Sequence, residues 1–311
     1  MSFPARVRIR EVAPRDGFQS LRDFIPTERK IEIINALAKT GVSDIEATSF
    51  VSPAAVPQLR DAKEVMSAVP RGKIAYSALV PNLKGAQNAV TAGADELLVV
   101  TSATEDHNLA NLRRTVAESL TDLDRIFELA KDSRVRVNGA IAVAFGCPYQ
   151  GDVPEKLVLR IAEAYASRGA NRIILADTTG MALPTNVVRM VKSFQAEFPV
   201  LELGLHFHNN RGTAMANLYA ALNEGVSTFD TALGGIGGCP YVPQASGNLA
   251  TEDVVYMLEE MGVRTGIDLV AAINAARFLE RSLGYVLPGQ VMKSGPRDPR
   301  LAKQFINNGH C

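Results

Sequence analysis

Apolar residues along this chain form short runs of strand length, separated by longer segments with the periodicity of amphipathic helices. One such segment, Thr27–Thr40, places Ile31, Ile34 and Leu37 on one face, and Gly41 follows as a predicted C-cap. The runs predict eight strands, at residues 6–13, 44–50, 73–80, 96–102, 134–145, 172–178, 202–208 and 228–234. The chain is therefore predicted to alternate strand and helix along almost its whole length.

A second signal is a glycine phrase that precedes several strands. It reads Thr40-Gly41-Val42, Ala92-Gly93-Ala94, Arg168-Gly169-Ala170 and Glu224-Gly225-Val226. Such a glycine is typical of the loop that leads from a helix into the next strand. Further along, Thr251-Glu252-Asp253 predicts an N-cap with acids in the first helical turn, and Gly262 predicts the end of that helix.

Eight strand–helix units in about 260 residues match a (β/α)8 TIM barrel in number and size. A doubly wound open sheet is the alternative, but it usually carries a glycine-rich first turn, and here that turn reads Pro14-Arg15-Asp16-Gly17. We expect one catalytic domain over residues 1–311, with the barrel at about 6–262 and a C-terminal helix and irregular tail at about 263–311. The tail after Gly284 is expected to contact a neighbouring subunit or the active site.

Composition narrows the class of protein. The 311 residues are 47% apolar, with 33 basic and 33 acidic side chains, so no overall charge favours nucleic acid or an anionic membrane as partner. No apolar run is long enough to span a bilayer, and the first residues lack a signal-peptide pattern. Three cysteines, an odd number, argue against a disulfide framework and predict a cytoplasmic protein.

Two of the four histidines lie close together, in the predicted strand at 202–208. Residues i and i+2 of a strand share a face, so His206 and His208 should project side by side, about 6–7 Å apart. Such a pair can share one metal ion or can be two hydrogen-bonded core histidines. The surrounding rim decides between these readings.

In a TIM barrel, reactive groups gather where the strands end. Polar residues at the predicted strand ends are Arg15, Asp16, Glu46, Asp177, Thr178, His206 and His208, and Cys239 and Asn248 follow in the glycine-rich segment after the last strand. Singly, Asp16 could cap a turn and Glu46 could pair with a basic residue. Gathered at one rim, they indicate a functional site.

The ligand types suggest which metal this rim would hold. Two histidines, Asp16 and an amide oxygen suit Mg²⁺ or Mn²⁺, with positions left for substrate. Zinc would more often recruit cysteine or a third histidine, and a two-histidine, one-carboxylate iron site is the alternative. Cys239 can serve as a nucleophile or a proton donor, whereas Cys147 fits a small buried residue.

The motifs together resemble the 3-hydroxy-3-methylglutaryl-CoA lyase family, metal-dependent TIM-barrel lyases related to Claisen condensing enzymes. The resemblance runs from about residue 6 to 283. It is carried by Arg15-Asp16-Gly17, Thr48-Ser49-Phe50-Val51-Ser52-Pro53, Pro81-Asn82-Leu83-Lys84-Gly85, Gly146-Cys147-Pro148-Tyr149, His206-Phe207-His208, Gly234–Tyr241 and Ala245–Asp253.

The resemblance implies a role for each rim residue. Asp16, His206, His208 and Asn248 would bind a divalent cation, and Glu46 would support that site. Catalytic roles are implied for Arg15, Asp16, Glu46 and Cys239. Asp16, or a water that it orients, would act as base, Arg15 would stabilise charge on the thioester oxygen, and Cys239 would protonate the enolate. Substrate or CoA contacts are implied for Arg15, Gln19, Lys84 and Arg211.

The segments that should contact the acyl group depart from the family pattern. Asn138-Gly139-Ala140 stands where Arg-Gly-Tyr is usual, Ser102-Ala103-Thr104-Glu105 where Ser-Glu-x-Phe is usual, and Asn209-Asn210-Arg211-Gly212 where Asp-Thr-Tyr-Gly is usual. Arg211 is a candidate for binding a substrate carboxylate, because a guanidinium pairs with a carboxylate through two hydrogen bonds. The reaction type is therefore better defined than the substrate.

The resemblance implies an oligomeric cytoplasmic enzyme of amino-acid catabolism that splits the CoA thioester 3-hydroxy-3-methylglutaryl-CoA into acetyl-CoA and acetoacetate. One alternative is a sister lyase for another 3-hydroxy-3-carboxyacyl-CoA. Another is a condensing synthase of the alkylmalate type, which the His208-Asn209 phrase also resembles. Those synthases usually continue into a regulatory domain, and the Cys239 loop favours cleavage. A third is a non-catalytic barrel that binds CoA esters or a partner protein.

Overall fold

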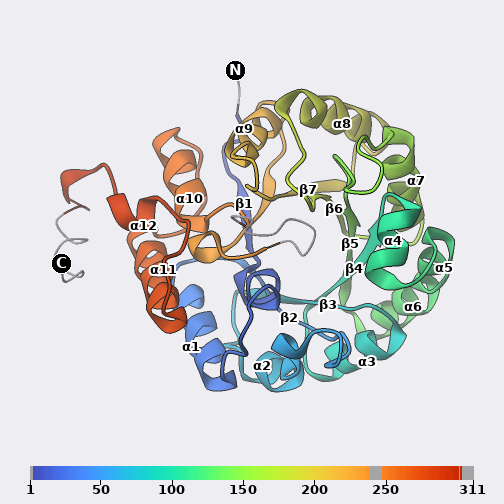
Figure 1. Ribbon diagram of the computed structural model, residues 1–311, viewed down its shortest axis with the longest axis horizontal. Helices are drawn as coiled ribbons and strands as arrows, with labels where there is room; N and C mark the ends of the chain where they lie inside the picture. Colours follow the sequence, from blue (N-terminus) through green and yellow to red (C-terminus); the bar gives the residue numbers. More distant parts are fainter. Residues whose placement is uncertain (1–2, 239–246, 301, 303–311) are drawn as a thin grey trace.

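Eight parallel strands close into a barrel in which each strand pairs with the next in sequence and β8 pairs with β1 (Figure 1). This computed structural model describes residues 3–238, 247–300 and 302. The predicted TIM barrel is confirmed. Its strands are β1 (Arg8–Glu11), β2 (Asp44–Ser49), β3 (Ala75–Leu79), β4 (Glu96–Ser102), β5 (Arg136–Ala142), β6 (Arg172–Asp177), β7 (Glu202–Phe207) and β8 (Thr228–Thr231).

All eight strands occur where the apolar runs predicted them, but several are shorter. The run at 134–145 yields a strand that ends at Ala142, because Val143 turns into the left-handed region with φ of 51°. The run at 228–234 ends at Thr231, and the chain then enters the short turn η3 (Leu233–Gly235). Because both strands end early, the backbone that follows each of them belongs to the rim loops, which carry polar residues.

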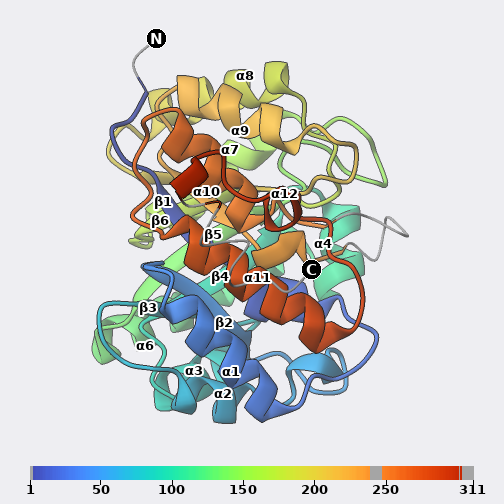
Figure 2. The same cartoon turned by 90° about the vertical axis from the view of Figure 1, so that its left-hand side faces the viewer.

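Helices surround the strands on the outside, and the last three lie together beside α1 and β1 (Figures 1 and 2). They are α1 (Thr27–Ala38), α2 (Ala62–Ala68), α3 (Leu83–Thr91), α4 (Glu105–Leu112), α5 (Val116–Thr121), α6 (Leu123–Ser133), α7 (Glu155–Ala166), α8 (Pro184–Glu197), α9 (Ala214–Asn223), α10 (Thr251–Glu260), α11 (Leu269–Leu283) and α12 (Val291–Ser294). None of the described helices is long and apolar enough to cross a membrane.

The repeated glycine phrase has one backbone conformation throughout. Gly41, Gly93, Gly169 and Gly225 have φ angles of 93°, 88°, 86° and 84°. Side chains with a Cβ rarely adopt these angles, so glycine is required where each helix turns into the next strand. The shared conformation confirms the repeating unit that the sequence predicted.

Two predicted helix caps were wrong in detail. The C-cap of α1 is Lys39, and Gly41 lies two residues beyond it. The N-cap of α10 is Ala250, and Thr251 is its first helical residue. The Thr251 hydroxyl is instead directed toward β1, where it donates to Glu11 Oε2 over 2.6 Å. A tertiary hydrogen bond has thus replaced the local cap.

The tail after Gly284 is more ordered than predicted, because it includes α12. The backbone N–H of Gly289 donates to the carbonyl of Gly234, and the N–H of Val291 donates to Asp253. This part of the tail therefore packs against the loop that follows β8. The predicted contact with another subunit stays a prediction.

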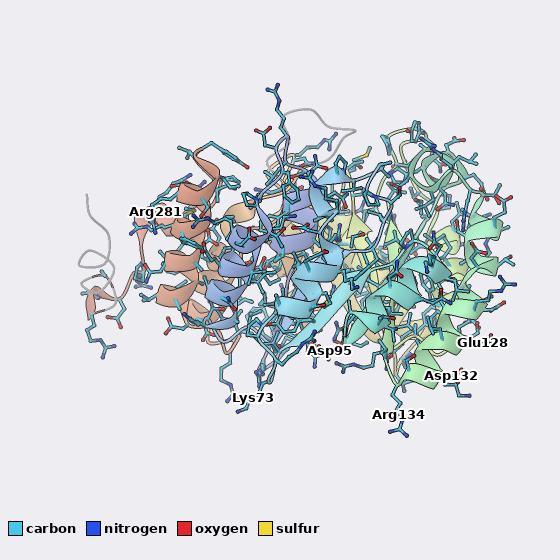
Figure 3. The ribbon with its side chains drawn as sticks, turned by 90° about the horizontal axis from the view of Figure 1, so that it is seen from below. Lys73, Asp95, Glu128, Asp132, Arg134 and Arg281 are labelled. Atoms are coloured by element: carbon cyan, nitrogen blue, oxygen red, sulfur yellow. The ribbon has the colours of Figure 1, made fainter. Side chains whose placement is uncertain are left out.

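The two ends of the barrel differ in character. Segments that precede strands carry exposed charges of both signs, such as Lys73, Asp95 and Arg134, seen at one edge in Figure 3. The opposite end, where the strands finish, gathers the buried polar groups described next. Mixed charge at the first end agrees with the absence of net charge in the sequence.

Candidate active site at the carboxyl ends of the strands

The histidine pair projects into the barrel mouth at the end of β7. His206 and His208 are both buried, with ring centroids 4.9 Å apart, closer than the spacing expected from strand rise alone. Together with Asp16 they form a cluster in which one ligand atom from each residue lies within 4.8 Å of the others. The sequence placed two of these side chains on one strand face, and the fold adds the third.

Asp16 reaches this cluster because the chain coils tightly after β1. The turn η1 (Ala13–Gly17) is π-helical, and the N–H groups of Arg15, Asp16 and Gly17 all point to the carbonyl of Val12. This turn holds Arg15 and Asp16 over the barrel mouth. Gly17 is required, because a Cβ there would lie 2.5 Å from Ile236 Cγ2.

Asn248 reaches the same point from the described segment that begins at Gly247. It forms an isolated bridge with His208, and its Nδ2 donates to Asp16 Oδ2 over 2.8 Å and to the carbonyl of Ile236 over 3.2 Å. Its Oδ1 is buried and has no hydrogen-bond partner among the described residues. That oxygen is available as a ligand.

The cluster fits a divalent cation. Both ring nitrogens of His208 are buried without a hydrogen-bond partner in the part of the chain that the structure describes, and Nε2 lies 3.6 Å from Asp16 Oδ2. Unpaired buried polar atoms are costly unless something else satisfies them. Imidazole nitrogens with a carboxylate and an amide oxygen form a mixed donor set that suits Mg²⁺ or Mn²⁺.

His206 is oriented by an acid that the sequence analysis missed. Its Nδ1 lies 3.2 Å from Asp230 Oδ2, and Asp230 is ion-paired with the buried Arg10 over 2.6 Å. Burial alone would lower the pKa of His206, but the hydrogen bond with Asp230 and the charge of Asp16 raise it. With Nδ1 held by Asp230, Nε2 is the nitrogen left for a ligand.

Arg15 lies between two carboxylates. Its Nε donates to Glu46 and its Nη1 to Asp16. Burial alone would raise the pKa of Asp16, but the Arg15 guanidinium and the two histidines hold it well below its usual range. A carboxylate with so low a pKa is a good metal ligand and a weak base. Arg15 is therefore held beside the candidate ligand Asp16.

The remaining predicted contacts lie farther out. Gln19 and Lys84 are exposed, Gln19 just after η1 and Lys84 in the first turn of α3. The Nη1 of Arg211 donates to the carbonyls of Thr179 and Gly180 over 2.7 and 3.0 Å. Arg211 thus already braces the loop after β6, and a bound carboxylate would share its guanidinium with these carbonyls.

Cys239 lies outside the described residues. The chain leading to it can be followed to Gly238 and passes beside the cluster: a Cβ on Gly237 would lie 2.5 Å from Asn248 Nδ2. Only glycine allows this close approach. Cys147 is buried, as predicted, and its Sγ lies 3.2 Å from Thr104 Oγ1.

Two predicted rim residues brace loops instead of joining the cluster. Asp177 accepts hydrogen bonds from the N–H groups of Met181 and Ala182, and burial raises its pKa to about 6. The Thr178 hydroxyl accepts from the N–H of Val143. These contacts hold the loops after β5 and β6 at the barrel mouth.

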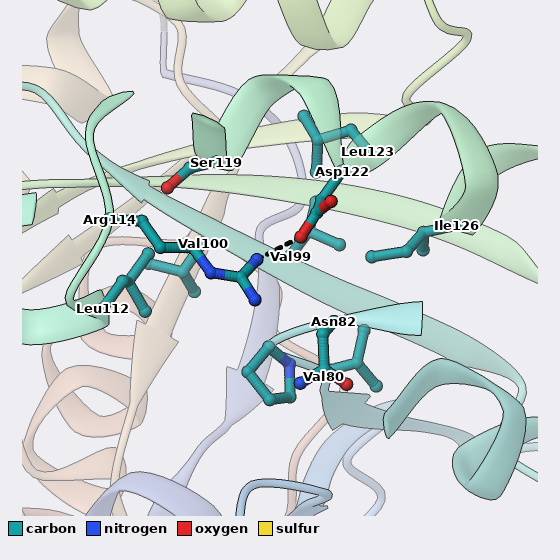
Figure 4. A pocket seen from close by; sticks show the side chains of 11 residues that line it. Val80, Asn82, Val99, Val100, Leu112, Arg114, Ser119, Asp122, Leu123 and Ile126 are labelled. Atoms are coloured by element: carbon teal, nitrogen blue, oxygen red, sulfur yellow. Dashed lines mark hydrogen bonds and ion pairs between the residues drawn. The ribbon is translucent and has the colours of Figure 1, made fainter. Parts of the chain in front are cut away.

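A small cavity of about 110 Å³ lies apart from this cluster, between the ends of β3 and β4 and the helices α5 and α6. Val99, Leu123 and Ile126 line it, and Arg114 points toward Asp122, with which it is ion-paired (Figure 4). None of the four predicted metal ligands lines this cavity. The chemistry suggested by the sequence therefore belongs to the barrel mouth.

Known proteins are similar to this chain along nearly its whole length. The profile of the HMGL-like family matches residues 6–279. A hydroxymethylglutaryl-CoA lyase of Bacillus subtilis is 44% identical over 298 residues, which are 94% of this chain and 100% of that protein. An (R)-citramalyl-CoA lyase of Chloroflexus aurantiacus is 41% identical over 306 residues, 95% of this chain and 96% of that protein.

Solved structures agree with these matches. An HMG-CoA lyase from Acinetobacter baumannii, in complex with coenzyme A and 3-methylmalate, superposes with a TM-score of 0.91 at 45% identity, covering 96% of this chain and 98% of that one. The carboxyl transferase domain of Rhizobium etli pyruvate carboxylase shares only the fold, with a TM-score of 0.69 at 16% identity.

Proposed function

This chain belongs to the HMGL-like family of carbon–carbon lyases, and we propose that it cleaves 3-hydroxy-3-methylglutaryl-CoA to acetyl-CoA and acetoacetate with a divalent cation bound at the barrel mouth. Relatives named as hydroxymethylglutaryl-CoA lyases support this proposal, and they align with more than nine-tenths of the chain. The coenzyme A complex of the Acinetobacter baumannii lyase supports an acyl-CoA substrate.

One observation carries the proposal: Asp16 of η1 converges with His206 and His208, at the end of β7, with ligand atoms within 4.8 Å of one another. Asn248 Oδ1 lies in the same cluster without a protein partner among the described residues. Arg15 adjoins it. We assign the metal to these four side chains and give Mg²⁺ or Mn²⁺ as its identity on donor type.

The reaction combines two proton transfers with the cleavage of one carbon–carbon bond, and these residues would assist each step. A bound cation would polarise the substrate hydroxyl and a neighbouring oxygen. Asp16 would take the hydroxyl proton, either directly or through a water that it orients and that passes the proton on to its carboxylate. The C2–C3 bond then breaks, so that C3 becomes the ketone of acetoacetate.

The electron pair of the broken bond moves onto the acetyl thioester, which becomes an enolate. Arg15 is placed to stabilise the charge on its oxygen, with Glu46 fixing the guanidinium. Cys239 gives its thiol proton to the enolate carbon, which completes acetyl-CoA. We assign the CoA and acyl contacts to Arg15, Gln19, Lys84 and Arg211.

A sister lyase activity is the second candidate, and the 41% identity to the citramalyl-CoA lyase favours it. Condensation of the alkylmalate type would use the same cluster, whereas tight binding of CoA esters without metal uptake would favour a non-catalytic barrel. We also propose a cytoplasmic location, on the cysteine usage, and a homo-oligomer, which light scattering of the purified protein would test.

The deciding experiment incubates the protein with Mn²⁺ and 3-hydroxy-3-methylglutaryl-CoA and follows acetyl-CoA and acetoacetate. Equal amounts of both products are expected, and chelation should stop their formation. His206→Ala should lose metal affinity and activity. Cys239→Ala should lose most turnover yet keep its metal. No product from this thioester, with cleavage of citramalyl-CoA, would move the assignment to the sister lyase.

A further inference from the structure

The barrel interior at the level of the histidines is divided into two unlike halves. In the strand register, His206 pairs with Asp230 on one side and with Ala176 on the other. Toward β8, β1 and β2 the interior is charged. Toward β6, β5 and β4 it carries alanines, valine and serine: Ala176, Ala142, Ala140, Val100 and Ser102.

Some inward residues of the non-polar half keep part of their surface exposed near the level of the metal cluster. Every residue of β4 except Val100 is buried, and Val100 is partly exposed. Every residue of β6 except Ala176 is buried, and Ala176 is partly exposed. Register partners share a face, and Val100 packs with Leu98, Ala140 and Ile174 in a cluster separate from the core outside the strands. Val100 also lines the small cavity between β3, β4, α5 and α6, so the exposure that we assign to the barrel mouth is that of Ala140, Ala142 and Ala176.

The side chains of this half are smaller than those that usually fill a TIM barrel. Bulky branched residues dominate the interior layers of this fold, whereas Ala140, Ala142 and Ala176 supply single methyl groups beside the mouth. Ala140 and Ala142 each keep 7% of their surface exposed. Below them, Leu98 and Ile174 form an apolar floor. We call the space bounded by Val100, Ala140, Ala142 and Ala176 the alanine hollow.

Neutral groups also border the hollow. At the same level as Ala142, the hydroxyl of Ser102 is hydrogen-bonded to His107 Nδ1 over 2.8 Å. Burial lowers the pKa of His107 to about 4, so that imidazole is neutral at physiological pH. A carboxylate placed here would lose its hydration without gaining a cationic partner from these residues.

We propose that the alanine hollow binds the non-polar substituent on C3 of the substrate and admits alkyl groups larger than methyl. The inference rests on the proposed function, because the substrate hydroxyl on C3 must lie at the Asp16–His206–His208 cluster. Ala176 stands on the strand next to His206, about 4.8 Å away. A substituent on the carbon that bears the hydroxyl therefore reaches the hollow directly.

The test compares thioesters that differ only at C3, namely 3-hydroxy-3-methylglutaryl-CoA and its 3-propyl homologue, in the Mn²⁺-loaded enzyme. Burial of each added CH₂ favours binding by up to about fourfold, so we expect kcat/KM for the propyl compound to equal or exceed that for the methyl compound. Kd values of the matching non-cleavable thioether analogues, measured by calorimetry, should follow the same order.

Ala142→Leu fills the hollow and should lower the propyl-to-methyl ratio of kcat/KM at least tenfold. Ala142→Val is the smaller replacement if the leucine variant does not fold, and it should shift the ratio in the same direction. Ala196→Leu is the control, because it makes the same replacement on the exposed face of α8. It should leave the propyl-to-methyl ratio of kcat/KM unchanged.

The outcomes separate this inference from the proposed function. Cleavage of neither thioester would overturn the proposed function. Two results would overturn the role of the hollow and leave the proposed function standing. One is cleavage of the methyl compound with a kcat/KM for the propyl compound more than 100-fold lower. The other is a propyl-to-methyl ratio of kcat/KM that Ala142→Leu does not change. A propyl preference that Ala142→Leu reverses would establish it.

Discussion

The Nδ1 atom of His206 lies 3.2 Å from a carboxylate oxygen of Asp230, on the neighbouring strand. Arg10 anchors that carboxylate from β1, and its charge lowers the pKa of Asp230. A carboxylate that accepts from Nδ1–H fixes both the ring orientation and the tautomer of a metal-binding histidine. Asp230 is thus the positioning residue of one predicted ligand.

Asp230→Asn should therefore weaken metal binding. An amide cannot hold the imidazole in one tautomer as a carboxylate does, and loss of such a partner typically lowers metal affinity about 10- to 100-fold. Calorimetric titration of the metal-free protein with Mn²⁺ measures this change. Asp132→Asn, an exposed change at the far end of the barrel, is the control (Figure 3). Equal affinity in both variants would contradict the role of Asp230.

Arg15→Lys should lower kcat much more than it changes metal affinity. The guanidinium of Arg15 contacts Glu46 and Asp16 at once, which a single ammonium group at that position reproduces poorly. Loss of a group that stabilises charge in the transition state typically costs about 10²- to 10³-fold in kcat. Steady-state kinetics with Mn²⁺ titration on the same samples separates the two effects. A kcat within threefold of the parent protein would refute the assignment.

The fold could be predicted because its signals are local. Strand-length apolar runs and one glycine per helix–strand turn recur with each unit, and the four glycines share a φ near 90° for one steric reason. Strand ends were predicted less well. Val143 ends β5 through a hydrogen bond to Thr178, a residue of another unit that local patterns do not reveal.

The candidate site could be predicted only in part. His206 and His208 were found because they share one strand face, and Asp16 because it follows a strand end. Asp230 and Arg10 were missed, since their contact joins positions 220 residues apart and arises only when β8 closes on β1. The signal was present in each strand as a charged residue at an inward position. It becomes interpretable only once the barrel is closed.

A buried ion pair outside the site predicts a large loss of stability. Lys30 Nζ lies 2.6 Å from Asp61 Oδ1, and both residues are buried. Lys30→Met would leave Asp61 as a buried, unpaired charge, which typically costs about 3–5 kcal/mol. Urea unfolding at pH 7 measures the loss. Exposed Lys63→Met on α2 should change stability by less than about 0.5 kcal/mol.

Two buried acids near the loop after β8 predict how stability changes with pH. Glu252 Oε2 accepts from the N–H of Gly234, and Glu11 Oε1 accepts from the N–H of Leu233. Burial raises the pKa of Glu252 to about 8 and that of Glu11 to about 7. Asp253 and Glu11 add like charge next to Glu252, which raises its pKa further.

The folded protein therefore holds protons on these acids that the unfolded chain releases above its ordinary carboxyl pKa. Their contribution is complete below about pH 4.5 and is lost as pH rises toward 8, so the free energy of unfolding should fall over this window. Each acid contributes a slope of up to about 1.4 kcal/mol per pH unit.

Glu252→Gln removes one of these titrating groups while keeping an oxygen for the N–H of Gly234. Its free energy of unfolding should fall less steeply than that of the parent protein between pH 5 and pH 8, and the variant should be the more stable of the two at pH 8. Glu128→Gln, on the exposed face of α6, should keep the parent slope. Urea unfolding at half-unit pH steps measures all three. Parallel slopes for the parent and Glu252→Gln would show that Glu252 is already ionised in the folded protein.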